Sequence, residues 1–407
     1  MDGTRTIVVI GGGPAGTFAA IAAKKQDPAA SVVLINNEHC EPYEKPPLSK
    51  TVLLGKVVPG DAPIAGPGGM AGHNVALETL AQCVAIDRNG RAVVLEDGRR
   101  LPFDALVIAT GSFAREIPQL PKGMPRVHYL RTEADARVLK AELSPGREML
   151  VVGGGLIGLE VAASAAELGV KATVLEIAPR ILARVCDKET GAAVHAAHRA
   201  HGVDIRTGTA LLEIAVQADG RIAATTSDGD RLSVDLVVVG TGSKPDDSLA
   251  AAAGLAVDDG IVVDAECRTS APEIFAAGDV VRFPGPHGLI RLENWRHAQD
   301  QGTVAGRNAA GAHEVYGAVP SFWSEQYDLY IQGVGWGAPD ATRVRRPAES
   351  NRALCFDVSD GHVVYAMGIN AQRDLATVRR LIERRVPVDA AALADPTRPL
   401  AAMLKPR

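Results

Sequence analysis

Apolar runs and glycine clusters follow each other in a fixed order along this chain. Near its start, the apolar run Ile7–Ile10 leads directly into the glycine cluster Gly11–Gly16. An alanine-rich segment comes next, for which the pattern predicts a helix through about Lys25, and a second apolar run occupies Val32–Ile35. Short, continuous apolar runs bounded by turn residues are typical of strands that are buried on both faces of a sheet.

The same order of elements returns in the middle of the chain. Leu150–Val152 precedes the glycine cluster Gly153–Gly158, a helix is expected through about Leu168, and Ala172–Leu175 forms the second apolar run. Strands that alternate with helices in this way form parallel sheets covered by helices. The sequence therefore predicts two dinucleotide-binding folds, one for each copy.

Two further apolar strands, Leu106–Gly111 and Leu236–Gly242, end in glycine turns and close the two copies. The final part of the chain differs, because alternating strands at Ala353–Val358 and His362–Ala366 precede a helix from about Ala371 to Arg385. These changes of pattern predict a discontinuous first domain at 1–112 and 243–320, a second domain at 113–242, and a C-terminal α+β domain at 321–407.

Composition excludes several classes of protein. The 407 residues suit two or three domains, and a net charge of -5 with a pI near 6.1 gives no reason to expect nucleic acid as a partner. No segment approaches the roughly 20 apolar residues of a membrane helix, and Ile7–Ile10 is too short for a secretory signal. The five cysteines are scattered, without metal-binding or redox spacing. We therefore expect a cytoplasmic protein that binds no metal.

The first glycine cluster has the spacing Gly11-x-Gly13-x-x-Gly16. In this motif the first glycine permits a tight turn, the second lets the backbone approach a pyrophosphate, and the third lets the helix pack on the strand. The N-terminus of the helix supplies N–H groups to the phosphates. Flavoproteins with two such folds commonly place the flavin in the first, so we expect FAD here. Its ribose ligand is either Asn37 or Glu38, of which Glu38 is preferred.

The second cluster repeats this spacing as Gly153-x-Gly155-x-x-Gly158, and Glu176 ends the strand that follows. A carboxylate at this position accepts hydrogen bonds from the ribose hydroxyls of NADH and repels the 2′-phosphate of NADPH. We therefore expect NADH rather than NADPH. In the alternative interpretation, Glu176 is a solvated residue at the end of the strand and Arg180 binds a phosphate.

Ile274–Asp279 has the pattern of a strand that ends in Gly278 and Asp279. Many flavoproteins with two such folds bring an aspartate in this setting to the ribityl chain of FAD. The alternative is that the side chain caps the next turn. A helix is expected from Asn294 through about Ala310, and the positive potential of its N-terminus would stabilise negative charge at the N1/O2 edge of reduced flavin.

Three segments, Pro42–Lys50, Val151–Glu160 and Ser321–Leu329, resemble in this order the ferredoxin reductases of Rieske-type oxygenase systems. Putidaredoxin and rubredoxin reductases and the FAD domain of apoptosis-inducing factor are wider relatives. The resemblance covers essentially the whole chain. It implies an α/β fold, with two Rossmann-like FAD- and NAD-binding domains of the glutathione-reductase type and a C-terminal α+β domain.

The resemblance also implies roles for single residues. Lys50 matches the family lysine beside flavin N5, and Glu160 matches the acid that pairs with it and orients the nicotinamide. A buried pair is costly without good geometry, which argues against a purely structural role. The positions expected to bind the cofactors are Gly11, Gly13, Ala15, Gly16, Asn37, Glu38, Lys45, Lys50, Val84, Thr110, Gly111, Arg131, Gly153, Gly155, Ile157, Gly158, Glu160, Glu176, Gly242, Gly278, Asp279, Trp295 and Trp323.

The chain departs from the family pattern at three places, one of which is Asn36-Asn37, where the family usually has Gly-Asp before Glu38. Lys45 stands where the family usually has arginine, which binds phosphate with two parallel hydrogen bonds, so we expect FAD to be held less tightly. The segment Pro59–Gly72 is rich in glycine and proline, does not resemble its family counterpart, and is expected to be a mobile surface loop. Disulfide reductases of this fold carry two cysteines in the segment that corresponds to Pro42–Leu54, and related oxidases and peroxidases carry one, whereas this chain has none there.

The expected reaction is hydride transfer from NADH to FAD, followed by single-electron transfer to an iron–sulfur protein, a [2Fe-2S] ferredoxin. Ferredoxins are usually acidic, so a basic docking face is expected, unless the arginines form only a solvated surface. Two alternatives are a flavoenzyme acting on a small molecule or oxygen, and a redox-sensing FAD scaffold. The chain is expected to be a monomer or homodimer. The arginines that are concentrated in the tail domain are Arg343, Arg345, Arg346, Arg379, Arg380, Arg384 and Arg385.

Overall fold

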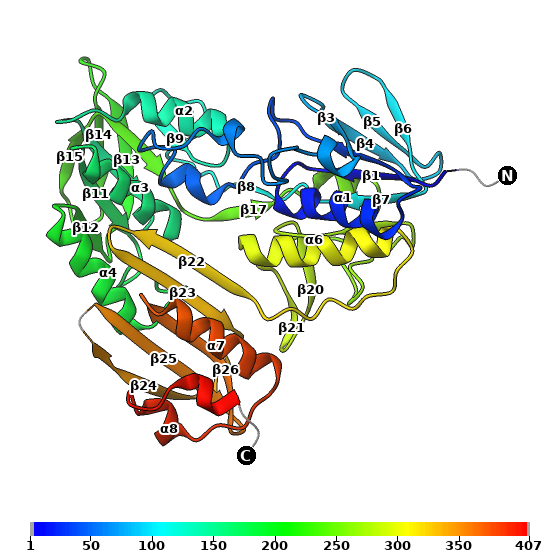
Figure 1. The fold of residues 1–407 in the computed structure, drawn as a ribbon. Coiled ribbons are helices and arrows are strands. Elements are labelled where there is room, and N and C mark those ends of the chain that lie inside the picture. Colours follow the sequence, from blue (N-terminus) through cyan, green and yellow to red (C-terminus); the bar gives the residue numbers. More distant parts are fainter. Residues whose placement is uncertain (1–3, 350, 405–407) are drawn as a thin grey trace. The chain divides into compact units, whose positions relative to one another are not determined.

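The computed structural model describes residues 4–349 and 351–404, which form two compact units (Figure 1). The first unit comprises the chain up to Pro46, Val58–Phe113 and Ser243–Ala318, and the second comprises Pro47–Val57, Ala114–Gly242 and the chain from Val319 onward. Strands β8 (Ser112–Ala114) and β17 (Ser243–Pro245) lie where the chain passes between the units. Each unit is therefore assembled from three separate stretches of sequence.

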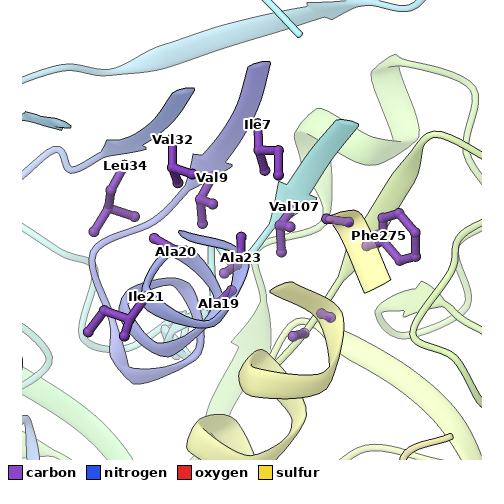
Figure 2. Close-up of a cluster of buried hydrophobic side chains, with 14 of the residues drawn as sticks. Ile7, Val9, Ala19, Ala20, Ile21, Ala23, Val32, Leu34, Val107 and Phe275 are labelled. Atoms are coloured by element: carbon purple, nitrogen blue, oxygen red, sulfur yellow. The ribbon is translucent and has the colours of Figure 1, made fainter. Parts of the chain in front are cut away.

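The first unit is built on a five-stranded parallel sheet in the order β19-β7-β1-β2-β3. Helix α1 (Pro14–Gln26) covers this sheet, and Figure 2 shows apolar side chains of β1, β2 and β7 facing the alanines of the helix. Helix α6 (Trp295–Ala309) packs closely on α1, because a Cβ on Gly302 would lie 2.2 Å from the Ala15 carbonyl oxygen. The strands are β1 (Thr6–Ile10), β2 (Ser31–Ile35), β3 (Ala76–Glu78), β7 (Ala105–Ile108) and β19 (Ile274–Ala276).

Smaller elements complete the first unit. They are the sheet of β4 (Cys83–Asp87), β5 (Ala92–Leu95) and β6 (Arg100–Pro102), the sheet of β18 (Ile261–Val262), β20 (Val281–Gly285) and β21 (Gly288–Ile290), helix α5 (Ser248–Ala252), and the 3-10 turns η2 (Pro59–Asp61) and η3 (Ala71–His73). A further 3-10 turn, η1 (Pro46–Ser49), lies where the chain enters the second unit.

The segment Pro59–Gly72 is held more firmly than expected. Met70 is fully buried in the main hydrophobic cluster of the first unit, and its N–H donates to the Glu41 carboxylate at 3.2 Å. Pro59 is also buried. The expectation of a simple surface loop is therefore wrong at Pro59 and Met70, because an apolar side chain within the glycine-rich stretch anchors it to the core.

The second unit contains another five-stranded parallel sheet, in the order β12-β11-β10-β16-β9. Helix α3 (Leu156–Glu167) follows its central strand across the second glycine loop, and its buried residues are apolar except for Glu160 and Ser164. The remaining elements are β9 (Val127–Tyr129), α2 (Glu133–Glu142), β10 (Glu148–Val152), β11 (Lys171–Glu176), α4 (Lys188–Ala200), β12 (Asp204–Thr207), β13 (Leu211–Val216), β14 (Ile222–Thr226), β15 (Arg231–Val234) and β16 (Leu236–Val239).

The C-terminal part of this unit is an antiparallel sheet in the order β22-β23-β26-β25-β24, with helix α7 (Gln372–Glu383) on one face. Leu375 and Val378 of α7 are buried, and Phe356 of β25 lies in the same cluster. The expected α/β fold class with a C-terminal α+β domain is thus confirmed. The elements are β22 (Ser321–Gln326), β23 (Leu329–Gly335), β24 (Thr342–Glu349), β25 (Arg352–Ser359), β26 (His362–Ile369), α8 (Ala390–Ala394) and η4 (Leu400–Leu404).

Candidate functional site

The first glycine loop has the geometry of a phosphate cradle. Gly11 has φ +110°, and a Cβ there would lie 2.2 Å from the Ala109 carbonyl oxygen, while a Cβ on Gly16 would lie 1.9 Å from the Gly11 carbonyl oxygen. Around Gly13, by contrast, no atom lies within 4 Å of the Cβ position. Gly13 is also the N-cap of α1 and offers no side-chain cap to the helix. The open space and the uncapped N–H groups fit the pyrophosphate of a dinucleotide.

In the first copy of the repeated pattern, the residue directly after β2 is an amide and not a carboxylate. The register pairs Ile10 with Ile35, so Asn36 holds the position that follows the strand, and its buried amide donates to the Cys40 carbonyl oxygen at 2.9 Å. Glu38 accepts hydrogen bonds from Tyr43 at 2.6 Å and from Lys45 at 2.8 Å. Lys45, which was expected at a phosphate, thus pairs with the carboxylate that was expected at the ribose.

Asp279 lies in the turn that follows β19 (Ile274–Ala276), three residues after the strand ends. Its Oδ2 accepts from the Ser112 hydroxyl at 3.2 Å, and Gly278 before it has φ +85°. The Gly278 N–H donates to the Gln301 side chain at 2.9 Å, which ties this turn to α6. Trp295 begins α6 and meets the Phe18 ring edge-on, with ring centroids 6.2 Å apart. The first glycine loop, the turn that holds Asp279 and the start of α6 therefore all lie within the first unit.

The second glycine loop repeats the cradle. Gly153 has φ +112°, and the nearest atom to a Cβ on Gly155 would be 3.9 Å away. Gly155 caps α3 without a side-chain hydrogen bond. Here the equivalent position does hold an acid, Glu176, the last residue of β11, and its Oε2 accepts the Gly154 N–H at 2.8 Å. A carboxylate is therefore held beside the loop, where the ribose of a dinucleotide is expected.

Arg180 is engaged locally, which bears on the alternative interpretation of this site. Its guanidinium donates to the carbonyl oxygens of Ile181 at 3.4 Å, Leu182 at 3.3 Å and Ala183 at 2.9 Å. Glu176 is also fixed by a second bond, from the Ala178 N–H to its Oε1 at 2.7 Å. The carboxylate faces the loop, whereas the guanidinium closes the turn that follows.

A buried cluster surrounds Glu160, on the second turn of α3. Its side chain is 7% exposed, and the Lys50 ammonium lies 3.3 Å from its Oε2. The Ser49 hydroxyl donates to the same oxygen, and the Ser324 hydroxyl donates to Oε1 at 2.6 Å. The Ser49 carbonyl oxygen in turn accepts from Ser164 of α3 at 2.8 Å. The two residues that the sequence singled out are thus brought together, with both carboxylate oxygens satisfied.

The other expected positions are spread over both units. Thr110 donates to the Asp246 carbonyl oxygen at 2.7 Å, and the Arg131 N–H donates to the Asp135 carboxylate at 3.0 Å. Val84 and Ile157 expose 49% and 45% of their surface, which leaves both available to a ligand. Trp323 lies on β22, and the turn glycines Gly111 and Gly242 have φ of +75° and +101°.

Sequence reasoning noted Asn36 only as a departure from the family pattern, and it missed the hydroxyl donors Ser49 and Ser324. The two serines lie inside segments that carry the family resemblance, and Ser49 directly precedes Lys50. That adjacency was the available signal, but a hydroxyl near a lysine predicts no partner by itself. Only the packing of both η1 and β22 against α3 identifies Glu160 as the carboxylate that the two serines reach.

The cysteines offer no redox pair. All five are free, and Cys40 is half-buried while the others are buried. Desolvation raises the pKa of Cys83 and of Cys186 to about 11, so these thiols are poor nucleophiles at neutral pH. Among the residues described, no group of His, Cys, Asp and Glu could hold a metal ion, and no helix is long and apolar enough to span a membrane.

Several tail arginines are paired within the chain. Arg343 forms two bonds with the Asp357 carboxylate, at 2.7 and 2.9 Å, and Arg345 contacts Asp187 at 3.2 Å. Arg346 donates to the Leu393 carbonyl oxygen, and Arg379 pairs with Glu383. Arg380, Arg384 and Arg385, around the end of α7, are exposed. The candidate basic face is therefore narrower than the sequence suggested.

Comparisons with known proteins agree with this geometry. Residues 5–302 match the family described as pyridine nucleotide-disulphide oxidoreductase, and residues 321–404 match the family described as reductase C-terminal. The chain belongs to the pyridine nucleotide-disulphide oxidoreductase family and is an oxidoreductase. Membership implies FAD and a pyridine nucleotide as cofactors, and the two glycine loops described above fit them.

Individual relatives are more specific. The ferredoxin–NAD(+) reductase component of the anthranilate 1,2-dioxygenase system from Burkholderia cepacia is 40% identical, over 96% of this chain and 97% of its own length. The corresponding component of the p-cumate 2,3-dioxygenase system from Pseudomonas putida is 37% identical, over 97% of each chain. The structure of the covalent putidaredoxin reductase–putidaredoxin complex matches with a TM-score of 0.93 and 32% identity, over 99% of each chain. The resemblance inferred from the three sequence segments is confirmed.

Proposed function

We propose that this chain is the NADH-dependent reductase component of an oxygenase system, which passes electrons from NADH through FAD to a [2Fe-2S] ferredoxin. The observation that carries the proposal is the buried Lys50–Glu160 pair, because it sits in the same unit as the second glycine loop and has both carboxylate oxygens satisfied. Relatives similar along nearly their whole length are named as ferredoxin reductase components, which supports the choice of acceptor.

We assign the residues as follows. Residues 1–112 and 243–320 bind FAD, 113–242 bind NADH, and 321–407 form the C-terminal domain. The uncapped start of α1 at Gly13 holds the pyrophosphate of FAD, Glu38 its ribose, and Asp279 its ribityl chain. Glu176 accepts the ribose hydroxyls of NADH and disfavours NADPH. Lys50 would face the flavin N5 edge and Glu160 would orient the nicotinamide. The bound flavin would supply the redox chemistry, taking up the two electrons of a hydride and giving them up one at a time with release of the proton.

The test is flavin reduction by NADH in a single turnover of the FAD-loaded protein. We expect Glu160→Ala to slow the limiting rate on the order of a hundredfold, since removal of a positioning contact to the reacting ring costs about this much. Bound FAD should be unchanged. Glu167→Ala is the matched control, because Glu167 lies on the same helix but its side chain is 42% exposed and is paired with the exposed Lys56. If both variants reduce the flavin at the wild-type rate, the assigned role of Glu160 is wrong.

A second measurement addresses the acceptor. The reduced protein is mixed with ferredoxins, rubredoxin or oxygen, and the rate of flavin reoxidation is recorded. Fast reoxidation by a [2Fe-2S] ferredoxin and slow reoxidation by oxygen is the expected result. Reoxidation that is fastest with oxygen, or with a small organic acceptor, would contradict the proposed function.

A further inference from the structure

A series of buried side chains, joined by hydrogen bonds, begins at Glu160 Oε1, whereas Lys50 contacts Oε2. The Ser324 hydroxyl donates to Glu160 Oε1 at 2.6 Å, and the Gln326 amide donates to the Ser324 oxygen at 3.0 Å. His198 Nε2 lies 2.8 Å from Gln326 Oε1. Ser324 and His198 are 0% exposed and Gln326 is 1% exposed, so water reaches none of these links.

The carboxylate at one end sets the direction of every hydrogen bond. Glu160, as the anion that pairs with Lys50, only accepts, so the Ser324 hydroxyl must donate to it and can only accept from its other neighbour. Gln326 must therefore present its NH2 group to Ser324 and its carbonyl oxygen to His198. That oxygen requires a proton on His198 Nε2, which leaves Nδ1 to accept from the Tyr327 hydroxyl, 3.1 Å away. All four links donate toward Glu160.

The protonation state of His198 agrees with this direction. Burial lowers the pKa of His198 to about 4, so the ring is neutral at pH 7 and carries one proton. Tyr327, at the outer end of this hydrogen-bonded series, is held by stacking, because its ring lies parallel to that of His201 with centroids 3.7 Å apart. Tyr327 occupies the turn between β22 and β23 with φ +56°. The hydrogen-bonded series thus links three elements of the second unit, namely α3, β22 and α4.

A purely structural role explains this arrangement poorly. Ser324 and Gln326 lie two residues apart on the inward face of β22, where apolar side chains would pack without any need for partners. Buried polar groups are costly unless every one is satisfied, and apolar replacements are often neutral. Proton relay is also a poor explanation, because the amide of Gln326 carries hydrogen bonds but does not readily give up a proton. The remaining explanation is that these hydrogen bonds act on the Glu160 carboxylate, at which the series ends.

We propose that Ser324, Gln326 and His198 are positioning residues for hydride transfer, which fix the orientation of the Glu160 carboxylate through one directed chain of hydrogen bonds. This inference rests on the proposed function, in which Glu160 orients the nicotinamide. Donors that are themselves polarised by further donors hold an anion more firmly than isolated ones. The orientation of Glu160 is therefore set by side chains of β22 and α4.

The test uses the FAD-loaded protein, with stopped-flow measurement of flavin reduction over a range of NADH concentrations. Ser324→Ala should lower the limiting rate on the order of tenfold to a hundredfold, since a hydrogen bond to a charged group is lost. His198→Met should lower it about threefold to tenfold, since its effect is transmitted through two further bonds. The NADH concentration at half-saturation should change little. His198→Gln places an N–H near the position of Nε2 and should restore the rate to within about twofold.

A double-mutant cycle separates this role from general damage to the fold. When Glu160→Ala is already present, His198→Met should have no further effect, because the hydrogen-bonded series then has no carboxylate to position. An equal loss in both backgrounds would overturn the inference. So would full rates for Ser324→Ala and His198→Met when Glu160→Ala alone is slow. A normal rate for Glu160→Ala itself would instead contradict the proposed function. Ser324→Ala alone decides the question if His198→Met fails to fold.

Discussion

Replacement of Glu176 by Ala tests the choice between NADH and NADPH. Glu176 ends β11, and its two oxygens accept the N–H groups of Gly154 and Ala178 at 2.8 and 2.7 Å, which fixes the carboxylate beside the second glycine loop. The strand places it where the adenosine ribose of a dinucleotide is expected. We expect kcat/KM to fall for NADH and to rise for NADPH, because one change removes both the acceptor for the hydroxyls and the repulsion of the 2′-phosphate.

The size of the change follows from the interactions that are lost. A hydrogen bond to a charged group contributes about 1.5–3 kcal/mol, so kcat/KM for NADH should fall about 10- to 150-fold. Two like charges about 4 Å apart in a water-like dielectric repel by about 1 kcal/mol, so NADPH should gain about fivefold. The ratio of the two kcat/KM values should therefore move by a factor on the order of 50 to several hundred.

The assay is steady-state turnover with each nucleotide and ferricyanide as acceptor. Glu213→Ala is the matched control, because Glu213 lies exposed on β13 of the same unit and its loss changes the net charge equally. The ratio for this control should stay at the wild-type value. If Glu176→Ala and Glu213→Ala give the same ratio, Glu176 does not bind the ribose and Arg180 again becomes the candidate for nucleotide recognition.

Further predictions concern stability and docking. Met70→Ala should destabilise the protein by about 2–5 kcal/mol in thermal unfolding, whereas Val58→Ala, at a 60% exposed position nearby, should have little effect; equal effects would contradict the anchoring role of Met70. Burial lowers the pKa of His297 to about 4, so the unfolded chain binds a proton that the folded chain does not between pH 6.5 and 4. His297 should account for about 3 kcal/mol of the stability lost as the pH drops through this window. His297→Phe should remove that share in unfolding titrations, whereas the share of His198, whose pKa burial also lowers to about 4, should remain. Charge reversal of Arg380 and Arg384 should lower the rate with an acidic ferredoxin about tenfold at low salt and leave flavin reduction by NADH unchanged; a ferredoxin rate that does not respond to salt would exclude these residues from docking.

Local signals predicted the elements of the fold closely. The helix expected from Asn294 through about Ala310 is observed as Trp295–Ala309, with the Asn294 side chain accepting the His297 N–H at 2.9 Å. The expected strand Ala353–Val358 is observed as Arg352–Ser359. Such signals succeed because a cap, a glycine turn and an apolar period all act within a few residues of each other.

Interactions between distant residues were beyond these signals. A single apolar residue, Met70, decides that a glycine-rich segment is anchored, although its neighbours give the segment a loop composition. Likewise, the arginine run of the tail suggests a basic surface, but Arg345 contacts Asp187, which lies 158 residues earlier in the chain. Composition describes a segment by its average, whereas burial and pairing depend on the partner that the fold provides.

The two glycine loops show the same limit at the candidate site. Both copies have the same strand register, so Asn36, directly after β2, and Glu176, the last residue of β11, hold equivalent positions. In the second copy the acid itself contacts the loop. In the first copy the position holds a buried amide whose Oδ1 accepts the Glu38 N–H at 3.2 Å, and the first carboxylate follows two residues later, bound to Lys45. The glycine motif therefore predicts that a dinucleotide binds. How its ribose is bound depends on the side chain at the end of the strand and on the tertiary partners of that side chain, and only the fold identifies these partners.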